Sequence, residues 1–429
     1  MLIIKKKTDL NNEKNRFLLF LVCIGLLLTA PLFSGILFLT LLLISPKKKI
    51  NYYIKEKWNH PLLISCLLMI IFTFINSNNG LQNNSFTNWM GLANWLPYIY
   101  CFFAFQNYLN SQKKRRLVLI TFLCGSIPIL FTGFGQVWFG WHGPFNFLNG
   151  AIIWYQRSLE ANQKGLSGLF NNANYAGSWL VIMLPICIAC FYQTMNKLRK
   201  AVVSILIIAI LIAIYLTKSR NALVGTLLSL TLTINWFYLL VLIGVTALVL
   251  FSFFLPPNFQ IIIKKLIPQN ISHNFSNWGL SNLLQYPRFF IWFNAFEFIL
   301  EKPFIGWGAA SFPILFEEKN NLWRGHTHNI FLELSISYGL IVSTTLAIFV
   351  FLLLFKSFKE IYINNINLNL PNRNSLIFDK AWWSASWALI ISQLFDVQYF
   401  DFRVSMILWV LLSGLECIIK EKKITKVVI

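Results

Sequence analysis

Two histidines at the edge of a long apolar run are the residues whose chemistry is easiest to interpret. His326 and His328 stand two residues apart, directly before Asn329 and that run. Polar groups at the edge of a membrane span are costly unless they bind something or do chemistry. A neutral imidazole can serve as a general base near neutral pH. If the segment is extended, its period of two points both rings in one direction, so we predict a base here.

Two other interpretations of the histidine pair stay open. Both residues could be purely structural, or the pair could hold a metal ion. A metal site needs further ligands, and the available carboxylates have no fixed spacing to the pair. These carboxylates are Glu317, Glu318, Glu333, Asp396 and Asp401. We therefore expect neither a metal nor a cofactor.

Two arginines lie where the chain should meet the membrane surface. Arg288 follows Pro287 at the start of an aromatic segment, which we expect to lie in the membrane interface. An arginine in the first turn of a helix makes an anion site. Arg220 lies with Ser219 in the short connection Thr-Lys-Ser-Arg-Asn, 217–221, between two apolar runs. The alternative for both arginines is contact with lipid headgroups.

A third motif, Gly-Leu-Phe-Asn-Asn-Ala-Asn-Tyr-Ala-Gly at 168–177, leads into another apolar run. Its Asn174 offers amide donors and acceptors at the membrane surface. Its glycines permit tight turns and close approach between helices. The alternative is a helix N-cap followed by a seam of small residues.

The composition indicates a membrane protein built from helices. Of 429 residues, 57% are hydrophobic and only 12% are charged, whereas a soluble domain has about 25% charged residues. Apolar runs near 20 residues recur along the whole chain, so we predict an all-α polytopic protein. The net charge of +21 does not indicate nucleic-acid binding, because the basic residues form short clusters between apolar runs.

The positions of the basic clusters predict the topology. Of the 36 Lys and Arg residues, 25 fall in segments that alternate as cytoplasmic connections between twelve spans, with both termini inside. Arginines that lie beside a span on the predicted outer side do not follow this bias, so a role other than setting the topology must explain them. The predicted spans are 17–30, 33–45, 61–76, 88–107, 117–134, 173–193, 201–217, 221–234, 236–255, 329–355, 381–395 and 404–419.

We expect one integral membrane domain over residues 1–429. A non-cytoplasmic loop should cover about 135–172, and a large periplasmic loop at 256–328 should carry part of the site. The connection at 356–380 should be cytoplasmic. The chain contains no P-loop, no Rossmann fingerprint and no nucleophile elbow, so no nucleotide chemistry is indicated.

Taken together, the motifs resemble the O-antigen ligase/polymerase superfamily over roughly 165–345. The segments that carry the resemblance are 168–177, 217–221, Pro-Arg-Phe-Phe-Ile-Trp at 287–292 and His-Thr-His-Asn-Ile-Phe-Leu-Glu at 326–333. The set is also similar to a cyanobacterial branch formerly labelled putative bicarbonate transporters. The loop at 256–328 is short for the family, which bears on how the acceptor docks.

The resemblance implies an enzyme of the bacterial cytoplasmic membrane that makes polysaccharide or lipopolysaccharide for the cell envelope. Such enzymes move a glycan from a polyprenyl diphosphate to a lipid or glycan acceptor on the outer face. A one-step displacement would invert the anomeric centre. The alternative is a bicarbonate or other solute transporter, which would need polar groups near the bilayer midplane. A non-enzymatic partner in glycan export is a third possibility.

The family's two important arginines would fall on Arg220 and Arg288, and its loop histidine on His328. The implied catalytic residues are His328, Arg288 and Arg220, and the candidate substrate-binding residues are His326, Asn329, Asn174, Arg324 and Ser219. The partners would be a polyprenyl-diphosphate-linked glycan, an acceptor and membrane lipids, with no nucleic acid. The sugar, the acceptor, the oligomeric state, the choice between ligase and polymerase, and which histidine is the base stay open at this point.

Overall fold

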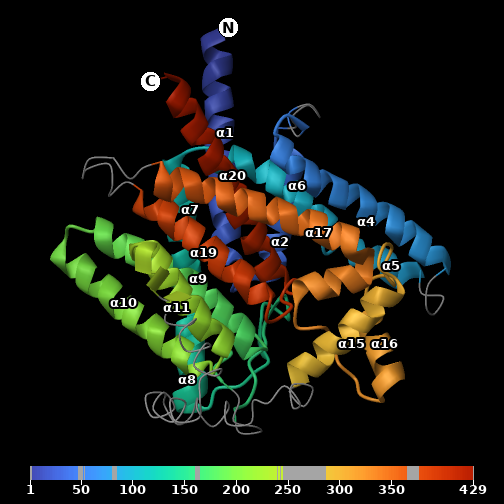
Figure 1. Ribbon diagram of the computed structural model, residues 1–429. Helices are drawn as coiled ribbons and strands as arrows, with labels where there is room; N and C mark the ends of the chain where they lie inside the picture. The colour runs from blue at the N-terminus through green and yellow to red at the C-terminus, as the bar shows by residue number, and fades with distance from the viewer. Residues whose placement is uncertain are drawn as a thin grey trace.

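The computed structural model describes residues 2–46, 54–79, 85–159, 165–238, 287–364 and 376–428, with a few single residues between these ranges. Within them the regular secondary structure is helical apart from one short hairpin, so the predicted all-α class is confirmed (Figure 1). The N- and C-terminal ends lie at the same end of the molecule, at the top of Figure 1.

The helices follow the apolar runs of the sequence. A helix pairs its backbone N–H and C=O groups internally, so an apolar run in helical form can lie in lipid or in the protein core. In the first half they are α1 (Leu2–Leu26), α2 (Pro31–Ile44), α4 (His60–Asn79), α5 (Ser85–Leu92), α6 (Leu96–Ala104), α7 (Gln112–Ser126), α8 (Pro128–Phe139), α9 (Ala173–Gln193), α10 (Lys197–Leu216) and α11 (Arg220–Ile234). In the second half they are α15 (Pro287–Glu301), α16 (Ser311–Asn320), α17 (Ile330–Phe358), α19 (Ile377–Gln393) and α20 (Phe402–Val428).

Among the described residues, six helical stretches are long and apolar enough to cross a membrane. They are Lys57–Asn78, Gln112–Phe139, Ala173–Gln193, Lys197–Leu216, Ile330–Ile363 and Phe402–Lys422. Two shorter apolar helices are Pro31–Ile44 and Arg220–Ile234. A polytopic membrane protein fits these helices, whereas the predicted number of twelve spans is not shown. The predicted span at 236–255 lies mostly outside the described residues, as do much of the 256–328 loop and the middle of the 356–380 connection.

Two predicted spans differ in form from the expectation. The prediction of one helix over 88–107 was wrong, because a turn at 93–95 separates α5 from α6 and Pro97 opens the second helix. Conversely, α7 and α8 run on as a single apolar stretch of 28 residues, since Pro128 stands at the start of α8, where proline is tolerated. The loop expected from 135 therefore begins only after Phe139. It contains the hairpin of β1 (Phe145–Phe147) and β2 (Ile152–Trp154).

The core of the molecule lies around α9, α19 and α20. These helices are buried over most of their length, and α19 packs against both α9 and α11. By contrast, α10 exposes apolar side chains such as Ile205, Ile208 and Tyr215, as a helix facing lipid would. At the end that carries the termini, Arg115 of α7 binds Asp379 of α19 at 3.1 Å and Glu421 of α20 at 2.6 Å. This buried ion-pair network holds three helices together.

A kink in α17 fixes the position of α15 and α16. Gly339 has φ +82° inside α17, a conformation that L side chains rarely adopt, and a Cβ there would collide with the carbonyl of Phe304. The kink frees carbonyls that the 303–308 turn then uses. The backbone N–H of Trp307 donates to the carbonyl of Ile336 at 2.7 Å. The aromatic helix α15 is thereby attached beside the start of α17.

Candidate functional site

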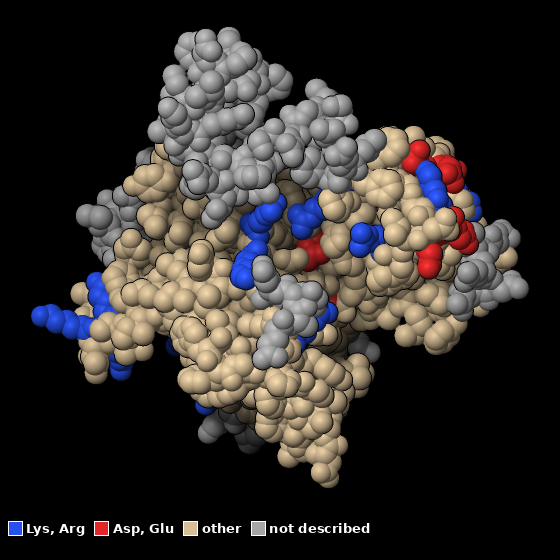
Figure 2. All heavy atoms as spheres, turned by 90° about the horizontal axis from the view of Figure 1, so that it is seen from below, with Lys and Arg blue, Asp and Glu red and all other residues tan. Residues whose placement is uncertain are grey.

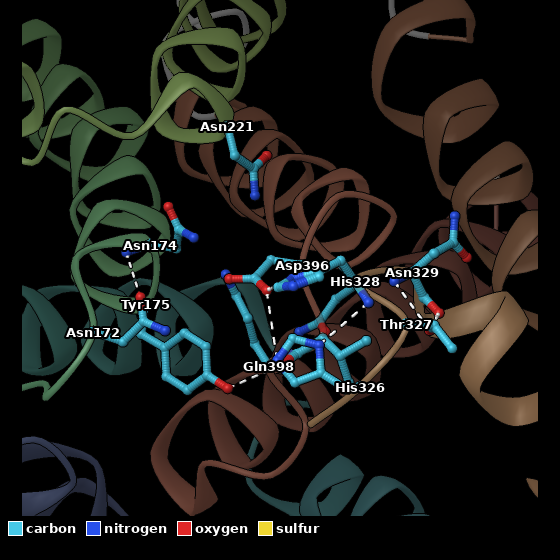
Figure 3. Close-up of polar contacts among 12 residues, drawn as sticks. Asn172, Asn174, Tyr175, Asn221, His326, Thr327, His328, Asn329, Asp396 and Gln398 are labelled. Carbon is cyan, nitrogen blue, oxygen red and sulfur yellow. Dashed lines mark hydrogen bonds and ion pairs between the residues drawn. The ribbon is translucent and has the colours of Figure 1, made fainter. Parts of the chain in front are cut away.

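Three titratable side chains meet where α17 begins and α19 ends. Nδ1 of His328 lies 3.0 Å from Oδ1 of Asp396, and Nε2 of His326 lies 4.0 Å from the same oxygen. Figure 3 shows both imidazole rings beside Asp396, with Asn174 and Asn221 coming in from α9 and α11. Asp396 is almost completely buried, and its second oxygen, Oδ2, has no hydrogen-bond partner among the described residues. The arrangement is a His–Asp pair with a second histidine next to it.

The hydrogen bonds assign different roles to the two histidines. The backbone N–H of His328 donates to Nδ1 of His326 at 3.2 Å, so the proton of a neutral His326 sits on Nε2. His328 instead donates from Nδ1 to the Asp396 carboxylate, which leaves the lone pair on its Nε2 free. Only His328 therefore offers an acceptor nitrogen that can take a proton from a substrate.

His328 occupies an unusual backbone conformation. Its φ is +56°, in the left-handed region that costs a residue other than glycine about 1–3 kcal/mol. The extended segment that the period-two argument assumed is therefore wrong in detail. The rings of His326 and His328 still converge, with centroids 4.3 Å apart, because the left-handed residue turns the chain. Strain of this kind is common where a side chain must be aimed at a site.

The segment before α17 is held by a set of specific contacts. The side chain of Asn329 caps α17, accepting from Phe331 N–H at 2.9 Å, and its amide donates to the carbonyl of Leu394 at 3.1 Å. The buried Glu333 accepts from the backbone N–H of Thr327 at 2.9 Å. Asn329 thus ties the start of α17 to the end of α19, and Glu333, which the sequence singled out, positions the histidine segment.

A second network holds the turn that carries Asp396. Gln398 donates to Ser178 of α9 at 2.8 Å and accepts from Ser392 of α19 at 3.1 Å. The Tyr175 hydroxyl donates to the carbonyl of Val397 at 2.9 Å. Because α9 and α19 both anchor this turn, the carboxylate of Asp396 has little freedom to move away from His328.

The two predicted arginines are exposed, and each lies in the first turn of a helix that contacts a segment of the site. Arg220 is the first residue of α11, next to Asn221, whose amide donates to the carbonyl of Ser392 at 3.1 Å. Arg288 lies one turn before Trp292, whose indole N–H donates to the carbonyl of Thr327 at 3.0 Å. Figure 2, a view from below Figure 1, shows Lys and Arg side chains around a hollow that has acidic atoms inside it.

The other predicted residues have more varied surroundings. Ser219 is buried and its hydroxyl caps α11, accepting from Ala222 N–H at 3.3 Å, so a capping role accounts for it. Asn174 sits in the first turn of α9 and its side chain lies on the side of Asp396 in Figure 3. Arg324 is exposed, two residues before His326.

Asp396 is the functional candidate that the sequence did not place in the site. It was considered only as one of five carboxylates without a fixed spacing to the histidines. Sixty-eight residues separate it from His328, so no local pattern links the two. The available signal was its scarcity: the chain has 15 acidic residues, and this one follows an apolar run at an end that is predicted to face outward.

A metal ion is the alternative use of this cluster, since one ligand atom from each of His326, His328 and Asp396 lies within 4.8 Å of the others. To bind a metal, Nε2 of His326 would have to give up its proton. Metal-bound histidines usually donate from the other ring nitrogen. In His326 that other nitrogen is Nδ1, which accepts a hydrogen bond from the backbone N–H of His328. It cannot accept this bond and also carry the proton that a metal-bound histidine donates. The tautomers therefore favour acid–base chemistry over metal binding.

Burial lowers the pKa of His326 to about 4, chiefly through desolvation, with the neighbouring His328 adding to the shift and Asp396 opposing it. The unfolded chain protonates this histidine near pH 6.5, whereas the folded protein does not. Stability should therefore fall as the pH drops from about 6.5 to about 4, by up to about 3 kcal/mol from this residue. Unfolding in detergent across this pH range measures the slope. The slope should be smaller in a His326→Gln variant, and equal slopes would contradict the prediction.

Comparison with known proteins agrees with the resemblance that the motifs indicate. The model of the O-antigen ligase family matches residues 205–350, a range that includes Arg220, Arg288, His326 and His328 but ends before Asp396. No curated protein matches the sequence. Residues 205–350 of this chain are therefore similar to the O-antigen ligase family.

Proposed function

We propose that this protein transfers a glycan from a polyprenyl diphosphate to a hydroxyl group of an acceptor, as an O-antigen ligase or polymerase. The observation that carries the proposal is the His328–Asp396 pair, held at 3.0 Å. The exposed Arg220 and Arg288 form the basic rim of the proposed site. A lipid-linked donor would present its diphosphate at that rim. Membrane glycan transfer of this class is also what the O-antigen ligase domain at 205–350 implies.

His328 is the general base of the proposed reaction. The acceptor oxygen attacks the anomeric carbon of the donor sugar while Nε2 of His328 takes the hydroxyl proton. The Asp396 carboxylate stabilises the imidazolium that forms, as a carboxylate does behind a histidine base. The bond between the anomeric carbon and the phosphate oxygen breaks in the same step. A single displacement of this kind inverts the anomeric configuration.

The arginines act on the leaving group. When the glycosidic bond breaks, the polyprenyl diphosphate gains negative charge on the oxygen that departs. Guanidinium groups bind phosphate oxygens in a forked geometry and do not lose their charge. Arg220 and Arg288, both exposed in the first turns of α11 and α15, are the candidates for this clamp. The proton goes to His328 and the charge to the clamp, so no resident metal is needed.

The proposal includes a topology. The end that carries both chain termini faces the cytoplasm, and the His–Asp pair faces the periplasm, consistent with the basic clusters of the sequence. The whole chain then works as one membrane domain. The 256–328 loop faces the acceptor side, and the 356–380 connection faces inward.

The decisive experiment is transfer by the purified protein in lipid nanodiscs. The donor is a synthetic polyprenyl diphosphate bearing a fluorescent oligosaccharide, offered with lipid or glycan acceptors. A fluorescent product with an inverted anomeric linkage supports the proposal. Failure to transfer with every acceptor, together with protein-dependent uptake of labelled bicarbonate into vesicles, would favour a transporter instead.

Arg220→Gln and Arg288→Gln should each lower the transfer rate about 10²–10³-fold, the usual cost of losing one group that stabilises developing charge. Both side chains are exposed, so neither change should alter the unfolding temperature. Arg199→Gln, an exposed arginine at the start of α10 in a predicted cytoplasmic segment, is the matched control. Equal losses in all three variants would show that the effect is not local to the site.

A further inference from the structure

A cavity of about 280 Å³ lies between α17, α19 and α20, with part of its wall from the turn between α5 and α6. Its lining is almost entirely apolar. Ile330 and Leu394 border it at the outer end, and Leu354 and Leu412 border it deeper in the bundle. The space extends from the start of α17 along more than half of that helix.

The cavity adjoins the candidate site directly. Ile330 follows Asn329, whose amide donates to the carbonyl of Leu394 at 3.1 Å, and Leu394 stands two residues before Asp396. Leu394, which accepts this bond from Asn329, and Ile330, the next residue after Asn329, therefore line the cavity beside the His–Asp pair. A molecule bound at the basic rim would need only a short connection to reach it.

The cavity also reaches the surface of α17 that faces lipid. Ala347 and Phe351 line it and are exposed, with Phe351 at 64%. Both lie within the apolar span Ile330–Ile363, so the opening meets the hydrocarbon core of a membrane. An apolar space of this size that opens into lipid will hold a chain rather than water.

We propose that this cavity receives the isoprenoid chain of the lipid-linked donor, in the segment next to the diphosphate; the inference rests on the proposed function. The cavity of about 280 Å³ has room for a short stretch of this methyl-branched chain, on the order of two isoprene units. The rest of the chain leaves past Ala347 and Phe351 into the membrane. Arg220 begins α11, which packs against α19, so the phosphate clamp and the cavity share one wall.

The first test compares donors of two chain lengths on variants that block the opening. The glycan is offered on a long polyprenyl diphosphate and on a single-isoprene diphosphate too short to fill the cavity. Ala347→Trp should raise KM for the long-chain donor about tenfold or more, because burial of even two methylene groups is lost. It should leave the short-chain kinetics unchanged. Ile348→Trp, at the neighbouring exposed position outside the cavity, is the matched control.

Equal effects of Ala347→Trp on both donors, or no effect on either, would overturn the inference. A second measurement does not depend on transfer. A polyprenyl diphosphate with a diazirine in its second isoprene unit should label α17 or α19 at the cavity, and unlabelled polyprenyl diphosphate should suppress the labelling. Suppression by phospholipid to the same extent would mean that the cavity holds an acyl chain. Labelling at the cavity without any glycan transfer would contradict the proposed function, whereas the proposal that the cavity binds the isoprenoid chain would stand.

Discussion

His328→Asn is expected to lower the rate constant of glycan transfer by about 10²–10⁴-fold, the contribution typical of a positioned general base. Asparagine is chosen because it tolerates the left-handed backbone that His328 adopts at φ +56°, so the fold should survive. Its amide can still reach Asp396 but cannot accept a proton from an acceptor hydroxyl. The measurement is kcat for the purified variant, with the unfolding temperature recorded in parallel.

Two companion variants make this prediction specific. His328→Gly also suits a positive φ and leaves a space for free imidazole, so added imidazole should restore part of the activity. His326→Gln should cost about tenfold or less, because Nε2 of His326 carries a proton and points toward Asp396 rather than acting as a base. A larger loss for His326→Gln than for His328→Asn would reverse the assignment of the two histidines.

Much of the helical framework could be predicted from local sequence. Helices α9, α10, α11 and α19 begin or end within a few residues of the predicted spans, because the length and flanks of an apolar run fix a membrane helix. The break at 93–95 and the continuous α7–α8 stretch were not predictable in this way. Both depend on how a proline at the start of a helix is packed, which hydropathy does not record.

In the candidate site too, some features could be predicted from local sequence and others depend on tertiary contacts. Its histidines were recognisable because they form a local motif at the edge of a span. The different roles of the two histidines could not be predicted, since they depend on one backbone hydrogen bond and on the left-handed conformation of His328. Asp396 was also out of reach, because it is aligned through α9, α19 and the cap of α17, contacts that join segments far apart in the chain.

Asp396→Asn is expected to lower kcat by about 10²–10⁴-fold while leaving KM for the donor nearly unchanged. The reason is the tautomer of His328. A carboxylate can only accept, so it keeps the proton of His328 on Nδ1 and the lone pair on Nε2. An amide can rotate and donate to Nδ1, which moves the ring proton to Nε2 and removes the base. The same substitution takes away the charge that stabilises the imidazolium.

Asp401→Asn provides the matched comparison, because Asp401 lies on the same turn but pairs with Arg403 instead of a histidine. If Asp396 acts through His328, then adding Asp396→Asn to a His328→Asn protein should cost little more, since the base is already lost. Multiplicative losses in the double variant would instead mean that the two residues act independently. A loss in Asp396→Asn that appears in KM rather than kcat would assign Asp396 to donor binding and leave His328 without its partner.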